Sequence, residues 1–377
     1  MKKGLVNKII IILIIVLAIF LILLFVNKVD GSLFNSSFKN NKEGIIEKDN
    51  NNYNDDMHSV DNSGSYVDNS QNSLNGIKIS TWVTYWDLPS KTFSENMPGD
   101  IKNVSYFAAN FNENNELVVP DKLKDFYNNT KDYNFKKYLT IVNDVIKSDG
   151  SSIQKDTEVL KMILYDKSSR ENNINQIVNL AIQYGFDGIE IDYERLKKDM
   201  TLWENFIPFI NELYSKASEK GLDLRVVLEP NIPFENLNFE KGPTYVMMCY
   251  NLHGGFSDPG EKANPEFIIS LIEGMNKYDV KKDFALATGG FDWPEGVSDS
   301  TDGNGKVKSV TENEAKSLIR EYNAEAIRDE ESKYLYFKYK DEDNINYEVW
   351  YADNETLNYL ASFILKEGYD VSLWRVE

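Results

Sequence analysis

"YGFDGIEIDYERL", residues 184 to 196, has the composition of a buried strand and yet contains several carboxylates. Alternate side chains of a strand share one face, so Glu190, Asp192 and Glu194 point to the same side. The residues between them are two isoleucines and a tyrosine, which point to the other side. One face of this strand is therefore acidic, and the opposite face is suited to packing in a core.

Seven further segments have the short length and the β-branched or aromatic composition of strands. These seven segments are residues 77–85, 104–110, 137–143, 224–229, 245–250, 284–290 and 370–376, and the stretch at 187–194 makes eight strands in all. Amphipathic stretches, among them 169–185 and 265–278, lie between several of them. Because no glycine-rich phosphate loop is present, this α/β pattern predicts a (β/α)8 TIM barrel rather than a doubly wound sheet. A hairpin pattern at 334–353 predicts a small α+β insertion after the seventh strand, at about 291–353.

In such a barrel the acidic face lies inside. Glu194 then stands at the C-terminal end of the fourth strand, where barrel enzymes place their chemistry. Carboxylates that lie close together in a poorly solvated interior raise one another's pKa, so at least one proton is expected to be shared. A carboxyl group that holds a proton near neutral pH suits proton donation to a leaving oxygen, as glycoside hydrolysis requires. A solvated acidic strand is the alternative, and the apolar residues on the other face argue against it.

The segment "FDGIEIDYE" resembles the D-G-x-D-x-D-x-E signature of glycoside hydrolase family 18, the chitinase-like barrels. This resemblance implies that Glu194 is the general acid/base and that Asp192 orients the 2-acetamido group of the substrate. The carbonyl oxygen of that group would act as the nucleophile, and configuration would be retained. Glu190 stands where the signature has an Asp, and Asp187 and Gly188 match its first two residues.

The likeness extends to other strands. "VMMCYN", residues 246 to 251, resembles the M-x-Y-D of the sixth strand, which implies that Tyr250 holds the acetamido oxygen. Asn251 replaces the Asp of that motif and would contact the substrate. Trp374 on the last strand matches the tryptophan that forms the floor of the sugar site. Together with Trp374, two further segments resemble the branch of spore-cortex and peptidoglycan N-acetylglucosaminidases, at residues 289–294 and 347–357.

Several other aromatic or polar residues are candidate substrate contacts. Tyr85, with Trp82 and Trp86, ends the first strand, where aromatic residues line a sugar cleft or pack in the core. Trp293 follows the seventh strand and is a candidate for stacking against a sugar. His253 follows the sixth strand and is either a substrate contact or a plain loop residue.

Composition excludes other classes of protein. The net charge of -19 argues against nucleic-acid binding, which needs clustered Lys and Arg. Two histidines and one cysteine are too few for a zinc site that is rich in histidine or built from four cysteines, so no metal or cofactor is expected. No G-x-S-x-G segment presents a nucleophilic serine. Cys249, the single cysteine, is expected to be a small buried apolar residue.

The N-terminus contains an unbroken apolar run over residues 9–26, which as a helix spans about 27 Å, close to the thickness of a bilayer core. No small-residue cleavage site follows, which favours an uncleaved anchor over a signal peptide. Lysines precede the run, so the N-terminus is expected to be cytoplasmic. Residues 1–30 are therefore predicted to hold the anchor, 31–76 an Asn/Asp/Ser-rich disordered tether, and 77–377 the barrel, outside the cell membrane.

These features predict a membrane-anchored, extracytoplasmic glycosidase that cleaves β-1,4 bonds after N-acetylglucosamine. Peptidoglycan is the expected polymer because a tether holds the domain at the wall. Chitin or its oligosaccharides are the second candidate. A non-catalytic, lectin-like barrel and a protein-interaction module of wall or spore assembly are the alternatives from other classes.

Overall fold

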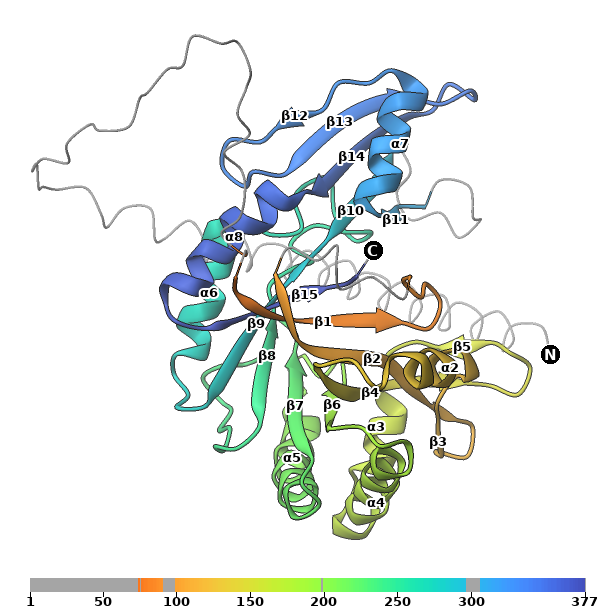
Figure 1. Cartoon of the computed structure of the whole chain (residues 1–377), viewed down its shortest axis with the longest axis vertical. Coiled ribbons are helices and arrows are strands. Elements are labelled where there is room, and N and C mark those ends of the chain that lie inside the picture. Colours follow the sequence, from red (N-terminus) through yellow and green to blue (C-terminus); the bar gives the residue numbers. More distant parts are fainter. Residues whose placement is uncertain (1–73, 75, 91–98, 198, 296–305, 377) are drawn as a thin grey trace, which may run out of the picture. The chain divides into compact units, whose positions relative to one another are not determined.

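Eight parallel strands close into a barrel in the computed structural model of the chain (Figure 1). The structure describes residues 74, 76–90, 99–197, 199–295 and 306–376. In order around the barrel, the strands are β1 (Lys78–Thr84), β2 (Asp100–Asn112), β4 (Lys136–Ile146), β6 (Gly188–Asp192), β7 (Asp223–Leu228), β8 (Thr244–Met248), β9 (Lys281–Ala287) and β15 (Asp370–Trp374). Each pairs in parallel with the next, and β15 pairs with β1. The predicted barrel is confirmed, with a strand at each of the eight predicted places.

Helices lie outside the barrel between most of these strands. They are α2 (Asp121–Thr130), α3 (Thr157–Ile163), α4 (Lys167–Tyr184), α5 (Met200–Glu219), α6 (Pro265–Met275) and α8 (Asn354–Lys366). Asp166 caps α4 by accepting a hydrogen bond from the Ser169 amide. Gly185 ends α4 with a φ of 78°, a left-handed turn that leads the chain directly into β6. Two short strands, β3 (Leu117–Val118) and β5 (Ser152–Ile153), pair antiparallel with β2 and β4.

A second sheet is formed by the chain between β9 and β15 (Figure 1). Its elements are β10 (Gly289–Pro294), β11 (Lys308–Val310), α7 (Glu312–Tyr322), β12 (Ile327–Arg328), β13 (Leu335–Lys340) and β14 (Asn346–Ala352). The strand order is β11-β10-β14-β13-β12, and neighbouring strands are antiparallel. Phe337, Val349 and Tyr351 form a small core with Ala315 of α7. An α+β element with its own core therefore follows the seventh barrel strand.

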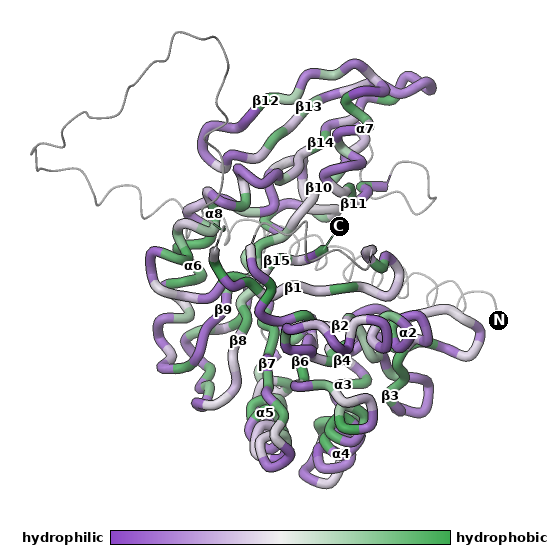
Figure 2. The backbone as a smooth tube through the Cα atoms, viewed as in Figure 1, coloured by the Kyte–Doolittle hydropathy of each residue, from purple (hydrophilic) through white to green (hydrophobic). Residues whose placement is uncertain are grey.

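The two faces of β6 have opposite character. On the face toward the helices, Ile189 and Ile191 are fully buried, and Tyr193 stacks on Phe209 of α5 with ring centroids 5.8 Å apart. Burying each large apolar side chain contributes about 1.5–3 kcal/mol to stability. Figure 2 shows hydrophobic residues along the barrel strands and in the helices beside them. The acidic residues of β6 point into the barrel, so the predicted division of this strand is confirmed.

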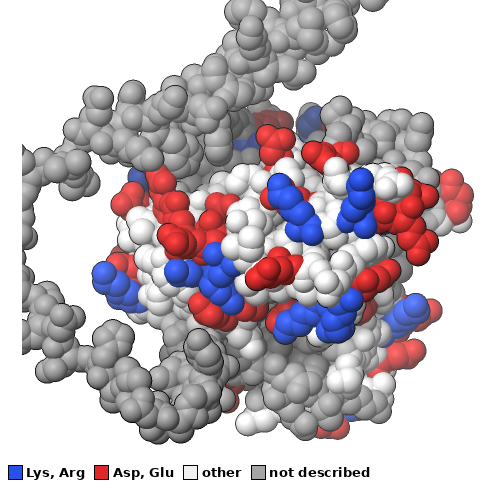
Figure 3. Space-filling view, turned by 90° about the horizontal axis from the view of Figure 1, so that it is seen from above, with Lys and Arg blue, Asp and Glu red and all other residues white. Residues whose placement is uncertain are grey.

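The predicted membrane anchor, at residues 9–26, lies outside the described residues. Among the helices that the structure describes, none is both long and apolar enough to cross a bilayer. In the view from above, acidic and basic side chains are interspersed over the described part of this face (Figure 3).

Candidate active site

The acidic face of β6 runs from the barrel interior to its C-terminal mouth. The exposed fraction is 0% for Glu190, 5% for Asp192 and 15% for the side chain of Glu194. The predicted strand at 187–194 includes Glu194. In the structure β6 ends at Asp192, so Glu194 lies two residues beyond the strand. The three carboxyl groups therefore occupy different environments, although they share one face.

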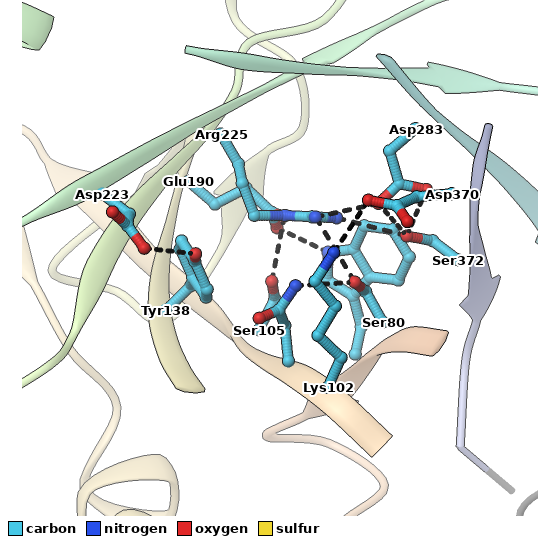
Figure 4. Close-up of polar contacts among 12 residues, drawn as sticks. Ser80, Lys102, Ser105, Tyr138, Glu190, Asp223, Arg225, Asp283, Asp370 and Ser372 are labelled. Atoms are coloured by element: carbon cyan, nitrogen blue, oxygen red, sulfur yellow. Dashed lines mark hydrogen bonds and ion pairs between the residues drawn. The ribbon is translucent and has the colours of Figure 1, made fainter. Parts of the chain in front are cut away.

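Glu190 is the centre of a buried polar network at the base of this face (Figure 4). Its Oε1 accepts hydrogen bonds from Trp82 Nε1 at 2.5 Å and Thr140 Oγ1 at 2.9 Å. Its Oε2 accepts from Ser105 Oγ at 2.9 Å and Arg225 Nε at 2.8 Å. Side chains from β1, β2, β4 and β7 thus meet on one carboxylate. This saturation leaves Glu190 no free oxygen lone pair aimed at a substrate.

Arg225 supplies the positive charge of this network (Figure 4). It is the β-sheet partner of Glu190 in the β6–β7 pairing and is 2% exposed. Its Nη1 donates to Asp283 Oδ2 at 2.9 Å. Burial alone would lower the pKa of Arg225, but the charges of Asp283 and Glu190 raise it above its ordinary value. One guanidinium group therefore binds the carboxyl groups of both Glu190 and Asp283.

Asp192 stands between this network and the mouth of the barrel. Burial, followed by the charges of Glu194 and Glu190, holds the pKa of Asp192 well above its usual range. Its Oδ1 has no hydrogen-bond partner among the described residues. Burial and the charges of Asp192 and Glu194 also raise the pKa of Tyr250, which follows β8, so its hydroxyl is a neutral donor. A carboxyl group with a raised pKa, an oxygen atom without a hydrogen-bond partner and a phenol therefore lie in one buried region.

The backbone of Glu194 is fixed by Asn143 of β4. Asn143 Oδ1 accepts from the Glu194 amide at 2.9 Å, and its Nδ2 donates to the Glu194 carbonyl oxygen at 3.1 Å. The next residue, Arg195, has a left-handed φ of 65°, and its amide donates to Glu229 Oε2 at 2.7 Å. These contacts turn the chain sharply after β6 and hold the Glu194 side chain at the mouth.

Two charged side chains outside the predicted set face Glu194. Lys155, between β5 and α3, forms an ion pair with Glu194 Oε2. Burial, and then the charge of Glu194, raises the pKa of Glu229. The mouth therefore combines several carboxyl groups with one ammonium group. Within the described ranges, no group of three His, Cys, Asp or Glu side chains is arranged to hold a metal ion.

Aromatic side chains form a floor beside the acids. Trp374 packs edge-on against Trp82, with ring centroids 5.6 Å apart, and against Phe107, at 4.9 Å. Trp82 and Tyr250 belong to the same buried cluster, which Trp374 and Phe107 border. Trp86 extends the series beyond Phe107 and is 53% exposed. A sugar ring could stack on such a surface, as predicted for Trp374.

Tyr85 and Asn251, two predicted substrate contacts, lie at the ends of strands that line the mouth. The Tyr85 ring packs edge-on against Trp86 with centroids 5.0 Å apart. Burial and the charge of Asp144 raise the pKa of Tyr85, so this phenol also stays neutral. Asn251 is exposed and has a left-handed φ of 66°.

Trp293 and His253 are both used in holding the loop that follows β8. Trp293 is 4% exposed, and its Nε1 donates to the Gly254 carbonyl oxygen at 3.1 Å. His253 Nδ1 lies 2.9 Å from the carbonyl oxygen of Glu261. Their polar atoms are therefore engaged by the loop, and the described contacts do not join either residue to Glu194.

Asp187 and Gly188, the first two motif residues, lie at the opposite end of the barrel. Asp187 Oδ2 accepts a hydrogen bond from the Lys137 amide at 2.9 Å, which ties β6 to β4. A Cβ atom on Gly188 would lie 2.4 Å from the Tyr138 ring and 2.9 Å from the Asp223 carbonyl oxygen. Both residues serve packing and strand pairing, far along the strand from the mouth.

The closed barrel with an α+β element after its seventh strand is a fold that solved chitinases and spore cortex-lytic enzymes share. This likeness agrees with the resemblance to chitinase-like barrels inferred from the sequence. Among solved structures, the Bacillus cereus spore cortex-lytic enzyme SleL superposes with a TM-score of 0.65 and 18% identity, over 81% of this chain and 72% of that one. A class V chitinase from Nicotiana tobaccum gives a TM-score of 0.62 and 17% identity, over 79% and 93% of the two chains.

Curated relatives agree with this class. Uncharacterized glycosylase YvbX of Bacillus subtilis (strain 168) is 25% identical over 218 residues, 54% of this chain and 60% of that protein. The Cortical fragment-lytic enzyme of the same organism is 22% identical over 251 residues, 58% of this chain and 53% of that protein. The chain thus spans only about half to three-fifths of the length of these relatives. No protein-family model matches the chain.

Four residues of the site were not identified from the sequence. Arg225 interrupts the apolar run of 224–229, and a buried cation on a strand requires a counterion, so its pairing with Glu190 had a readable signal. Asn143 ends the predicted strand at 137–143, a place where polar residues of a barrel face the mouth. Glu229 ends the predicted strand at 224–229, likewise at the mouth, and Lys155 lies in a connection whose course the strand and helix patterns do not predict.

Proposed function

We propose that this chain is a membrane-anchored, extracytoplasmic glycosidase that cleaves β-1,4 bonds after N-acetylglucosamine with retention of configuration. The observation that carries the proposal is Glu194 at the barrel mouth, next along the same face to Asp192, whose pKa is raised by burial and by the charges of Glu194 and Glu190. Glycoside hydrolysis needs a carboxylic acid to protonate the leaving oxygen, and we assign this role to Glu194. The barrel mouth is also where this fold places its chemistry.

In the proposed mechanism, Glu194 protonates the glycosidic oxygen while the acetamido carbonyl oxygen of the substrate attacks the anomeric carbon. The free Oδ1 of Asp192 accepts the acetamido N–H, and the Tyr250 hydroxyl donates to its oxygen. Glu194, now a carboxylate, takes a proton from the water that opens the oxazolinium ring. Two displacements at one carbon give retention, and no second carboxylate nucleophile is required. Trp374 offers the stacking floor.

Peptidoglycan is the proposed polymer because relatives and structural neighbours carry the names cortical fragment-lytic and spore cortex-lytic enzyme. Chitin is the second candidate, since other neighbours are named chitinases and one is described in complex with NAG4. The apolar run at residues 9–26 supports a single-pass anchor with the N-terminus in the cytoplasm. A tether over 31–76 would then give the barrel access to the wall.

A lectin-like barrel is the competing function. Two substitutions favour it, since Glu190 and Asn251 replace Asp residues of the family motifs. Glu190 is engaged by four donors within the protein, so its oxygen atoms are occupied by the fold. The presence of Glu194 at the mouth and the raised pKa of Asp192 favour catalysis instead.

The test is hydrolysis by the full chain in mild detergent, with purified peptidoglycan and chitotetraose as substrates. Mass spectrometry identifies the sugar at each new reducing end, and proton NMR gives its first-formed anomer. We expect new reducing ends that are N-acetylglucosamine in the β configuration. Release by Glu194→Gln should be at least 100-fold slower. Release by the control Glu204→Gln, which changes an exposed acid of α5, should be normal. Binding of either polymer without release by the wild type would support the lectin instead.

A further inference from the structure

Lys155 is a cation that pairs with Glu194, the predicted general acid. Its Nζ donates to Glu194 Oε2, and the side chains are 38% and 15% exposed respectively. Burial lowers the pKa of Lys155, but the charges of Glu194, Asp192 and Glu229 outweigh it and keep the group protonated. The ammonium group therefore lies at the open end of the acidic face, where it meets both protein and solvent.

The backbone around Lys155 is built to hold it there. Lys155 has a left-handed φ of 54°, which is unfavourable for a residue with a side chain. Its amide donates to Asp144 Oδ1 at 2.7 Å, and the next amide, of Asp156, donates to the Asn143 carbonyl oxygen at 2.8 Å. Arg195 Nη1 adds a bond to the Gln154 carbonyl oxygen at 3.1 Å. The turn is thus fastened to both the end of β4 and the segment after Glu194.

This ion pair opposes the proposed reaction as long as it persists. A neighbouring ammonium group favours the charged form of a carboxyl group, whereas a general acid must carry a proton. Glu194 Oε2 is also the atom engaged by the lysine. A substrate carboxylate that pairs with Lys155 would release Glu194. The ammonium group would remain paired, because one ion pair replaces another.

We propose that Lys155 is a specificity-determining residue. Its ammonium group moves away from Glu194 and binds a carboxylate that the glycan carries beside the cleaved bond. This inference rests on the proposed function and narrows its substrate to acidic glycans, such as those containing a lactyl ether carboxylate. Because the carboxyl groups of Glu194 and Glu229 border the mouth, an anionic glycan needs a local cation to enter it. A neutral chitin chain lacks the carboxylate and leaves Lys155 on Glu194.

The test compares two oligosaccharides that differ only in charge. One is a peptidoglycan-derived tetrasaccharide with free lactyl carboxylates, and the other is the same compound with those groups converted to methylamides. With the full chain we expect kcat/KM to be at least tenfold higher for the acid form. Lys155→Met should bring this ratio close to one, Lys155→Arg should preserve most of it, and Lys161→Met, at an exposed lysine of α3, should leave it at the wild-type value.

An equal ratio in wild type and Lys155→Met would overturn the inference, because Lys155 would then only neutralise the acidic mouth. Equal loss on both substrates would also overturn it and indicate a structural role. If the wild type cleaves neither compound, the proposed function fails, and calorimetric binding decides the inference separately. At least tenfold weaker binding of the acid form by Lys155→Met supports it, and unchanged binding contradicts it.

Discussion

Glu190 and Glu194 are identical residues on one face of the same chain segment, and the structure gives them opposite surroundings. Glu190 is fully buried and accepts hydrogen bonds from four side chains, one of them Arg225. Glu194 lies at the barrel mouth, its backbone held by Asn143 and its side chain paired with Lys155. The fold fixes the carboxylate of Glu190 on all sides. Glu194 is held through its backbone, and its carboxyl group lies at the barrel mouth.

This difference shows how one motif divides stability from chemistry. A buried carboxylate with complete partners is a structural element. Loss of Arg225 would leave a buried charge without its counterion, and loss of a neutral donor would leave a buried oxygen unsatisfied. A carboxyl group at the mouth contributes little to folding and is available to a substrate. Asp192 lies between the two and shares features of both, because it is buried and yet has a free oxygen.

The largest expected effect is on stability, at the buried end. Glu190→Gln removes the charge that faces Arg225 and places an amide NH2 among hydrogen-bond donors. Breaking a buried, hydrogen-bonded ion pair costs about 3–5 kcal/mol. We expect urea unfolding of this variant to show a loss in that range.

The matched control for this loss is Glu194→Gln, the same change at the other end. Its ion pair with Lys155 is partly exposed, so the free energy of unfolding should fall by less than about 1 kcal/mol. Equal losses in the two variants would remove the distinction drawn between the two carboxylates.

A smaller effect is expected where the backbone of Glu194 is held. Asn143→Ala removes hydrogen bonds to both the amide and the carbonyl oxygen of Glu194, at a residue that is 1% exposed. Unsatisfied buried polar groups cost about 1–3 kcal/mol. We also expect kcat to fall about tenfold with little change in KM, because the acid is displaced and binding is not.

Steady-state kinetics and urea unfolding of Asn143→Ala check both expectations. Asn128→Ala, at an exposed position of α2, is the control and should change neither quantity. Full activity in Asn143→Ala would show that Glu194 is positioned by other contacts.

The pH dependence of stability tests Asp192. Its pKa is raised by folding, so between the unfolded value, about 3.9, and the folded value the native state binds more protons than the unfolded state. Stability is therefore highest below that window and falls as the pH rises through it, by at most about 1.4 kcal/mol per pH unit for one group. Asp192→Asn removes this titration.

Urea unfolding at pH 5 and pH 7 measures the effect. The wild type should lose more stability between these values than Asp192→Asn does. Identical pH slopes in the two proteins would contradict a raised pKa of Asp192.

Periodicity accounts for what the sequence predicted well. The alternation of 187–194 placed two isoleucines on one side and the acids on the other, and strand spacing identified the barrel. The partners of the acids were not predicted, because they depend on which strands become neighbours and on loop geometry. Arg225 meets Glu190 through strand register, and Lys155 reaches Glu194 through a left-handed turn that no hydrophobic pattern encodes.

Turnover by folded Glu194→Gln is the decisive measurement for the role of Glu194. Release of reducing ends from peptidoglycan or chitotetraose is expected to fall at least 100-fold, at a temperature where the far-ultraviolet circular dichroism of the variant equals that of the wild type. Undiminished release by the folded variant would contradict the assignment of Glu194 as the acid at the barrel mouth.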